Sequence, residues 1–196
     1  MLEILISTFL AYLPYAAVTA FTPGPNNILS LHAIAQNGWH QGQKVLYGIA
    51  VGFLCVMCIC GFLCWGLAQF LPGITTILTY LGATYILWLA WHIAKSQPDN
   101  TAGSQASFLQ GMALQFINVK IYMYGLTVFS TYILSVSQNP LFAAGNVLIL
   151  TLIGASGSLT WGLAGGLLQN FIKNYFRPFN LAMAAILVIC AIQILI

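Results

Sequence analysis

The sequence predicts an all-α integral membrane protein, with six transmembrane helices in two inverted three-helix repeats. Three observations lead to this prediction: the apolar composition, the long uncharged segments and an internal sequence match. Of the 196 residues, 60% are hydrophobic and only 4% are charged, whereas about 25% of the residues of an ordinary soluble domain are charged. Five basic and two acidic side chains cannot cover the surface of a water-soluble domain of this size.

Turn residues and polar residues divide the chain into six hydrophobic segments, and a membrane-spanning helix needs about 20 apolar residues. The segments lie at about 5–36, 44–70, 74–95, 107–136, 141–168 and 176–196. A polar stretch at 96–105 separates the third segment from the fourth. We therefore expect one transmembrane domain over 1–196, made of a first repeat at 1–95, a cytoplasmic loop at 96–107 and a second repeat at 108–196.

Helices are expected rather than a β-barrel, because the segments lack the alternation of about ten residues that barrel strands show. Lys and Arg are enriched in cytoplasmic loops. Four of the five cations lie in or beside the loops after the first, third and fifth segments, namely Lys44, Lys95, Lys173 and Arg177. Both termini are therefore expected on the opposite side of the membrane. The start, Met-Leu-Glu, lacks the basic region of a signal peptide, so the first segment is expected to remain in the protein.

A short internal match indicates that the chain repeats itself. Trp65-Gly66-Leu67-Ala68 recurs as Trp161-Gly162-Leu163-Ala164, although a tetrapeptide in an apolar chain can also match by chance. An odd number of spans in each repeat turns the second copy upside down. Inverted repeats are common among secondary transporters, whose binding site lies at the repeat interface near the middle of the membrane.

The first candidate site is an interruption inside the first hydrophobic segment, Thr22-Pro23-Gly24-Pro25-Asn26-Asn27. Proline has no N–H group and clashes with the carbonyl four residues earlier, so the two prolines are expected to break the helix and free the carbonyls of Thr19 and Phe21. The helix that follows would begin with unpaired N–H groups and a positive dipole end. This pattern favours a site for an amino-acid-sized ligand and, equally, a kink that only shapes packing.

The second candidate site is Asn118-Val119-Lys120 in the fourth segment. Lys120 lies about 13 residues into a helix expected to start near Ser107, and a charged side chain at this depth is expensive and by default functional. The alternative is a lysine that extends its amine to the membrane surface. Lys120 could bind a carboxylate or could release and take up a proton.

The cysteines and histidines predict neither a metal site nor a cofactor site. Cys55, Cys58, Cys60 and Cys64 fall on one expected helix, and the first two match a C-x-x-C pattern. Without nearby acidic residues or histidines, these residues are interpreted as small packing residues. The three histidines stand alone in the sequence. Phosphate loops, paired carboxylates and Ser/His/Asp sets are absent from the sequence, so an enzyme is not expected.

Two motifs resemble the lysine-exporter (LysE/RhtB) family of bacterial amino-acid exporters. Residues 21–27 (FTPGPNN) look like its first-helix signature, and residues 115–120 (QFINVK) look like its fourth-helix signature, with Val119 where many relatives have proline. Residues 23–29 (PGPNNIL), 85–91 (YILWLAW) and 114–121 (LQFINVKI) are most similar to the cysteine and O-acetylserine exporter branch. The resemblance implies a multi-pass protein of the bacterial inner membrane, with both termini expected in the periplasm.

The resemblance also implies export of small neutral amino acids, driven by proton antiport with alternating access. The N–H groups after Pro25 and the Lys120 cation are expected to bind the substrate carboxylate. Asn26, Asn27, Asn118 and the carbonyls at the first break are expected to receive the ammonium group.

A transmembrane thiol oxidoreductase that uses the cysteines of the second segment is the alternative function, and a purely structural subunit is a third. The expected partners are the lipid bilayer and the small amino-acid substrate, without nucleic acid. The sequence leaves open whether the chain forms a homodimer.

Overall fold

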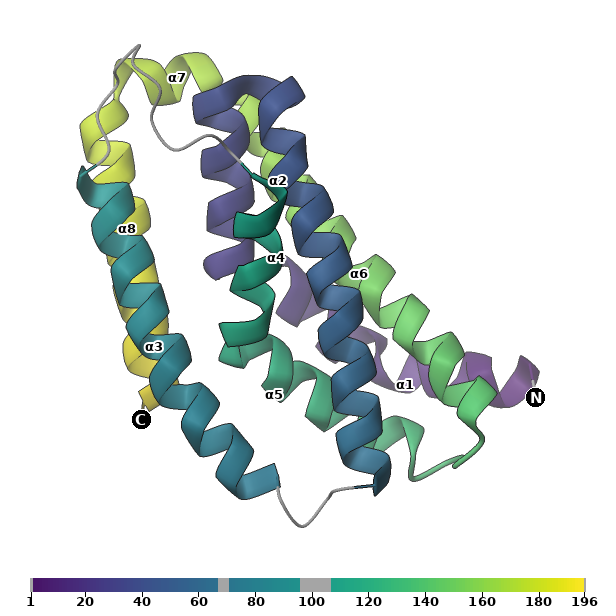
Figure 1. The fold of residues 1–196 in the computed structure, drawn as a ribbon. Helices are drawn as coiled ribbons and strands as arrows, with labels where there is room; N and C mark the ends of the chain where they lie inside the picture. The colour runs from purple at the N-terminus through teal and green to yellow at the C-terminus, as the bar shows by residue number, and fades with distance from the viewer. Residues whose placement is uncertain (1, 67–70, 96–106, 196) are drawn as a thin grey trace.

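The computed structural model describes residues 2–66, 71–95 and 107–195 of the chain, and every regular element in these ranges is helical (Figure 1). The elements in chain order are α1 (Leu2–Phe21), α2 (Pro25–Gly66), α3 (Leu71–Lys95), α4 (Phe108–Ile117), α5 (Val119–Val128), the π-helical turn η2 (Phe129–Ile133), α6 (Pro140–Leu167), α7 (Gln169–Asn174) and α8 (Phe176–Leu195). The prediction of an all-α protein is confirmed. The central loop lies almost entirely outside the described residues.

Several of these helices are suited to a membrane. Within the described ranges, α1, α2 and α6 are long and apolar enough to cross a bilayer, and α4 with α5 and η2 forms a bent pair that would be a fourth span. Large apolar side chains such as Leu10, Leu141 and Leu152 are exposed, as expected for a surface that faces lipid. The chain is therefore an integral membrane protein, and the count of six spans stays a prediction.

Helix α2 consists of two arms that meet at Gly38. Gly38 has φ 71° and ψ 172°, a backbone conformation that glycine adopts without steric cost. After this residue the helix reverses its direction (Figure 1). A Cβ atom on Gly42 would lie 2.7 Å from Ile34 Cδ1 and 2.8 Å from the Ala33 carbonyl oxygen, so the two arms are in contact beside the bend. The bend lies between the first and second segments that the sequence predicts.

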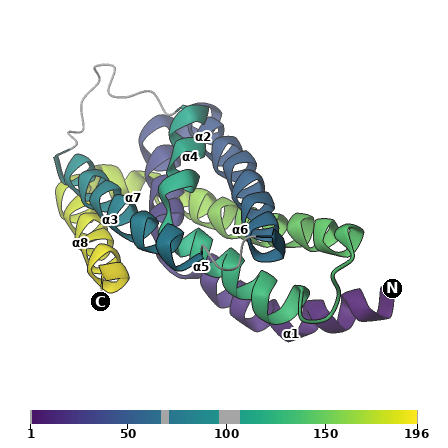
Figure 2. The ribbon, with the colours of Figure 1, turned by 60° about the horizontal axis from the view of Figure 1, so that its bottom comes forward.

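The first predicted segment, 5–36, covers two elements. Helix α1 ends at Phe21, α2 begins at Pro25, and the three residues between them are not helical. Helix α1 runs along α5 and η2 (Figure 2), where Tyr12 contacts Tyr132 and Tyr15 stacks on Tyr124 with ring centroids 6.4 and 6.0 Å apart. Helices α1 and α2 therefore run in different directions on either side of residues 22–24.

Glycines bring α2 into backbone contact with its neighbours. A Cβ atom on Gly48 would overlap the carbonyl oxygen of Phe108 in α4, and one on Gly111 would overlap that of Val45 in α2. Helix α6 meets the first arm of α2 in the same way, because a Cβ atom on Gly165 would overlap the Leu31 carbonyl oxygen. Small residues at such crossings are typical of membrane helices. These contacts hold α2, α4 and α6 together.

Helices α3 and α8 form a separate pair, which lies to the left of the first arm of α2 in Figure 1. Ile86, Leu89 and Ala90 of α3 are buried together with Leu187 and Ala191 of α8. The loop expected between the fifth and sixth segments contains the short helix α7, which the sequence analysis did not predict. The amphipathic signal of a six-residue helix is too short to recognise in an apolar chain.

Candidate functional site

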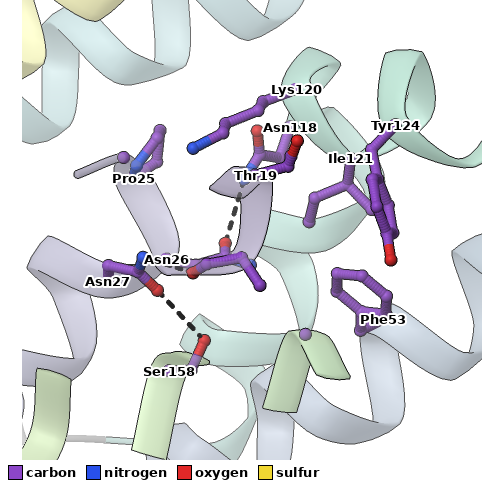
Figure 3. A pocket seen from close by; sticks show the side chains of 13 residues that line it. Thr19, Pro25, Asn26, Asn27, Phe53, Asn118, Lys120, Ile121, Tyr124 and Ser158 are labelled. Carbon is purple, nitrogen blue, oxygen red and sulfur yellow. Dashed lines mark hydrogen bonds between the residues drawn. The ribbon is translucent and has the colours of Figure 1, made fainter. Parts of the chain in front are cut away.

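A pocket lies where α1 ends and where α2 and α5 begin (Figure 3). Its empty space, together with the solvent at its open side, amounts to about 410 Å³. The pocket is lined by Thr19, Ala20, Gly24, Pro25, Asn26, Asn27, Phe53, Asn118, Lys120, Ile121, Tyr124, Gly154 and Ser158. It therefore brings together residues from both halves of the chain.

Asn118 separates α4 from α5. Its backbone is extended, with φ −84° and ψ 94°, and the two helices are bent by 61°. The Asn118 N–H donates back to the Gln115 carbonyl, and the Asn118 carbonyl accepts from the N–H of Ile121. The helix is thus interrupted here although position 119 is a valine and not a proline.

Lys120 lies in the first turn of α5 and is half-buried. From the sequence, Lys120 is expected about 13 residues into a helix that starts near Ser107, and the bend at Asn118 puts it directly beside the helix interruption. The Lys120 Nζ donates to the Thr22 hydroxyl at 3.0 Å and to the Thr22 carbonyl at 3.4 Å. A Cβ atom on Gly24 would lie 3.2 Å from Nζ. The ammonium group is therefore next to the residues that precede α2.

Three amide side chains link the two helix interruptions. Asn26 Nδ2 donates to Gln115 Oε1 at 2.8 Å, and Gln115 Nε2 donates back to Asn26 Oδ1 at 3.0 Å. Asn118 Nδ2 donates to the same Asn26 oxygen at 2.9 Å (Figure 3). Because this oxygen already accepts two hydrogen bonds, it has no free lone pair for a substrate ammonium group.

Side chains of the protein already bind the carbonyls at the end of α1. The Thr22 hydroxyl donates to the Thr19 carbonyl at 3.2 Å, and the Trp161 indole donates to the Phe21 carbonyl at 3.0 Å. Asn27 Nδ2 donates to the carbonyls of Ala20 and Thr22, both at 2.8 Å. The two carbonyls that the prolines were expected to free thus have partners, and Asn27 joins the two sides of the interruption.

The pocket contains most of the residues that the sequence predicts for it. Six of the eight line it, namely Gly24, Pro25, Asn26, Asn27, Asn118 and Lys120. Thr22 contacts the site through Lys120, whereas Pro23 is exposed and does not line the pocket. The site also contains residues that the sequence does not predict, among them Gln115, Tyr124 and the α6 residues Gly154 and Ser158. A second amide three residues before Asn118 was a usable signal, but glycine and serine in a membrane helix point to nothing specific.

Two polar atoms of the pocket residues have no hydrogen-bond partner in the described part of the chain. They are Asn118 Oδ1 and the Tyr124 hydroxyl, and both atoms are buried. An unpaired buried polar atom costs about 1–3 kcal/mol, so such atoms are rare in stable structures. Both atoms belong to residues that line the pocket.

The cysteines lie away from this pocket. Cys55, Cys58, Cys60 and Cys64 are free thiols on α2. Cys60 Sγ lies 3.9 Å from the Tyr122 carbonyl oxygen and Cys64 Sγ lies 3.8 Å from that of Leu126. These contacts fit the interpretation of Cys60 and Cys64 as packing residues between α2 and α5, whereas Cys58 is exposed.

The amide network leads to a prediction for Gln115→Met. Methionine keeps the length of the side chain but leaves Asn26 Nδ2 without its partner, at a cost of about 1–3 kcal/mol. For a chain of this size, we expect the apparent melting temperature in detergent to fall by about 2–10 °C. Gln110→Met is the control, because the Gln110 side chain is half-buried at the start of α4 and lies outside the network. Equal melting temperatures for the two variants would contradict the role of Gln115.

Comparison with known proteins identifies the family. Residues 17–196 match the family described as "LysE type translocator". The chain is 44% identical to the cysteine/O-acetylserine efflux protein of Klebsiella pneumoniae over 188 residues, which cover 95% of this chain and 96% of the relative. The proteins of the same name in Escherichia coli K12 and Shigella flexneri are each 43% identical; the alignments cover 94% and 99% of this chain and 95% and 99% of those relatives.

No solved structure gives a significant match. The resemblance stated from the two motifs is confirmed, and the chain is a transporter and not an enzyme, which removes the thiol oxidoreductase as an alternative. From its match over residues 17–196, this chain belongs to the LysE type translocator family.

Proposed function

We propose that this chain exports small neutral amino acids, such as cysteine and O-acetylserine, from the cytoplasm. The observation that carries the proposal is the pairing of the Lys120 ammonium group with the first turn of α2 in one pocket. Lys120 is the only ionised side chain among the residues that line it. The printed names of the relatives, cysteine/O-acetylserine efflux protein, supply the substrate class.

The substrate carboxylate binds between Lys120 and the start of α2. The N–H groups of Asn26 and Asn27 lie in the first helical turn, where backbone donors lack partners within the helix. A helix N-terminus also attracts anions through its dipole. Lys120 donates to the Thr22 hydroxyl and carbonyl, and a bound carboxylate takes over one of these hydrogen bonds.

The substrate ammonium group binds at Asn118. Its Oδ1 is buried and has no partner in the described residues, while its Nδ2 is tied to Asn26 and fixes the orientation of the amide. Asn26 and Asn27 are then positioning residues, because their own amides are engaged with the protein. The pocket lining contains no carboxylate, which fits a neutral substrate rather than a cationic one.

Alternating access between two inverted repeats is the proposed transport mechanism. Two features support it: each repeat, 1–95 and 108–196, contributes one helix interruption, and the two interruptions meet at the pocket. The loop 96–107 joins the repeats. Discontinuous helices at a repeat interface are the usual binding sites of such transporters. Proton antiport is proposed as the energy source, with Lys120 as the candidate site of coupling.

The proposed orientation places both termini in the periplasm, supported by the cations of the loops after the first, third and fifth segments. A C-terminal alkaline phosphatase fusion should therefore be active, and a GFP fusion at the same position should remain dark. A fluorescent GFP fusion with an inactive phosphatase fusion would show the opposite topology.

Amino-acid excretion tests the proposed function. Cells that overproduce the protein should accumulate cysteine or O-acetylserine in the medium faster than cells with the empty vector. Overproduction of Lys120→Met to the same level controls for effects of membrane-protein overproduction. Unchanged excretion of every small neutral amino acid would reject the proposed substrate class.

A further inference from the structure

The Tyr124 side chain combines deep burial with a polar hydroxyl group. The residue is 3% exposed, it lines the pocket, and its hydroxyl has no hydrogen-bond partner in the part of the chain that the structure describes. A buried tyrosine normally finds a partner for its hydroxyl. Tyr12, which is also fully buried, donates to Asn146 at 2.9 Å. The difference between these two tyrosines points to a partner for Tyr124 that comes from outside the protein.

The position of Tyr124 indicates which part of a substrate it meets. In Figure 3, the Lys120 amine points toward Pro25, whereas the Tyr124 ring lies on the opposite side of Asn118 with its hydroxyl beside Phe53. A substrate with its carboxylate at Lys120 and its ammonium group at Asn118 therefore extends its side chain toward Tyr124. This orientation rests on the proposed function.

The wall around Tyr124 is otherwise apolar. It consists of Phe53 and Ile121 together with the backbone at Gly154. A Cβ atom on Gly154 would lie 2.5 Å from Phe53 Cζ, so the Phe53 ring packs directly on α6 and its position is fixed. The Phe53 and Tyr124 ring centroids are 6.0 Å apart. Beside these apolar neighbours, the Tyr124 hydroxyl is a buried polar group without a partner in the described residues.

We propose that the Tyr124 hydroxyl selects substrates with a polar side chain by forming a hydrogen bond to it. A phenolic hydroxyl both donates and accepts, so it can pair with an ester carbonyl or with a thiol. A site built to hydrogen-bond a substrate rejects the analogue that lacks the group, because the protein group is then left unpaired. Tyr124 is a specificity-determining residue, separate from the groups that bind the carboxylate and the ammonium.

The test compares two amino acids whose side chains have the same shape. O-acetylserine and homoleucine have side chains of the same heavy-atom outline, but homoleucine has carbon in place of both ester oxygens. Each is used to inhibit the transport of labelled cysteine into inside-out membrane vesicles. For the wild-type protein, we expect O-acetylserine to inhibit at a concentration at least about tenfold lower. For Tyr124→Phe, the two inhibitory concentrations should become equal within about twofold.

Tyr122→Phe is the matched control, because Tyr122 is buried on the same helix but does not line the pocket. It should keep the wild-type ratio. Tyr124→Met serves as a second variant if the phenylalanine variant does not reach the membrane. Wild-type vesicles that transport no cysteine would reject the proposed function itself. Transport with no preference for O-acetylserine, or a preference that Tyr124→Phe retains, would overturn only the role of Tyr124.

Discussion

Lys120→Met is expected to reduce export about a hundredfold while the amount of protein in the membrane stays at the wild-type level. Methionine preserves the length of the side chain but removes the ammonium group that lies beside Thr22 and Gly24. A hydrogen bond to a charged group contributes about 1.5–3 kcal/mol, and each 1.4 kcal/mol is a factor of ten. The measurement is the initial rate of labelled cysteine transport in inside-out vesicles.

Lys44→Met is the control for this variant. Lys44 is exposed and donates to Gln41 within α2, far from the pocket residues. It should transport at the wild-type rate. If Lys120→Met retains near-normal transport, the carboxylate is not bound by this lysine and the proposed mechanism is wrong.

Gly48→Ala is expected to destabilise the fold more than any other single methyl group added to the α2–α4 contact. The new Cβ would overlap the Phe108 carbonyl oxygen, which belongs to the backbone and cannot turn away as a side chain would. Overpacking of this kind costs about 1–3 kcal/mol and sometimes more. We expect the apparent melting temperature in detergent to fall by about 5–10 °C.

Gly145→Ala is the matched control, because a Cβ at this position has no heavy atom within 4 Å. Its melting temperature should stay at the wild-type value or rise by about 1–4 °C, because alanine favours a helix interior over glycine by about 0.5–1 kcal/mol. A loss of stability as large for Gly145→Ala as for Gly48→Ala would mean that the contact with Phe108 does not explain the effect, because helix propensity alone favours alanine over glycine.

The sequence predicted the helices because their signals are local. The uncharged apolar segments match α3, α6 and α8 to within a few residues at each end. Residues 22–24 between α1 and α2 are not helical, and the break expected there rests on the missing N–H group of proline, which depends only on residue type. By contrast, the bend at Asn118 has no proline, and it explains why Lys120 lies at a helix start rather than in the middle of a helix.

The site could be predicted only where a polar residue is conspicuous in an apolar segment. Asn26 and Lys120 meet this condition, and both line the pocket. Gly154 takes part because it lets the Phe53 ring approach α6, which depends on how two distant helices cross. The Tyr124 hydroxyl is significant only because its surroundings, as far as the structure describes the chain, give it no hydrogen-bond partner, and no sequence pattern reveals that.

The hydrogen bonds between Asn26 and Gln115 also have a consequence for the order of events during synthesis. The two residues are 89 positions apart, and a ribosome adds about 5–20 residues per second. The Asn26 amide therefore waits about 4–18 s after its own synthesis before its partner exists. During that time the start of α2 can enter the membrane, but its hydrogen bonds to Gln115 cannot yet form. The final structure of the first helix interruption is thus formed late, when the fourth hydrophobic segment leaves the ribosome.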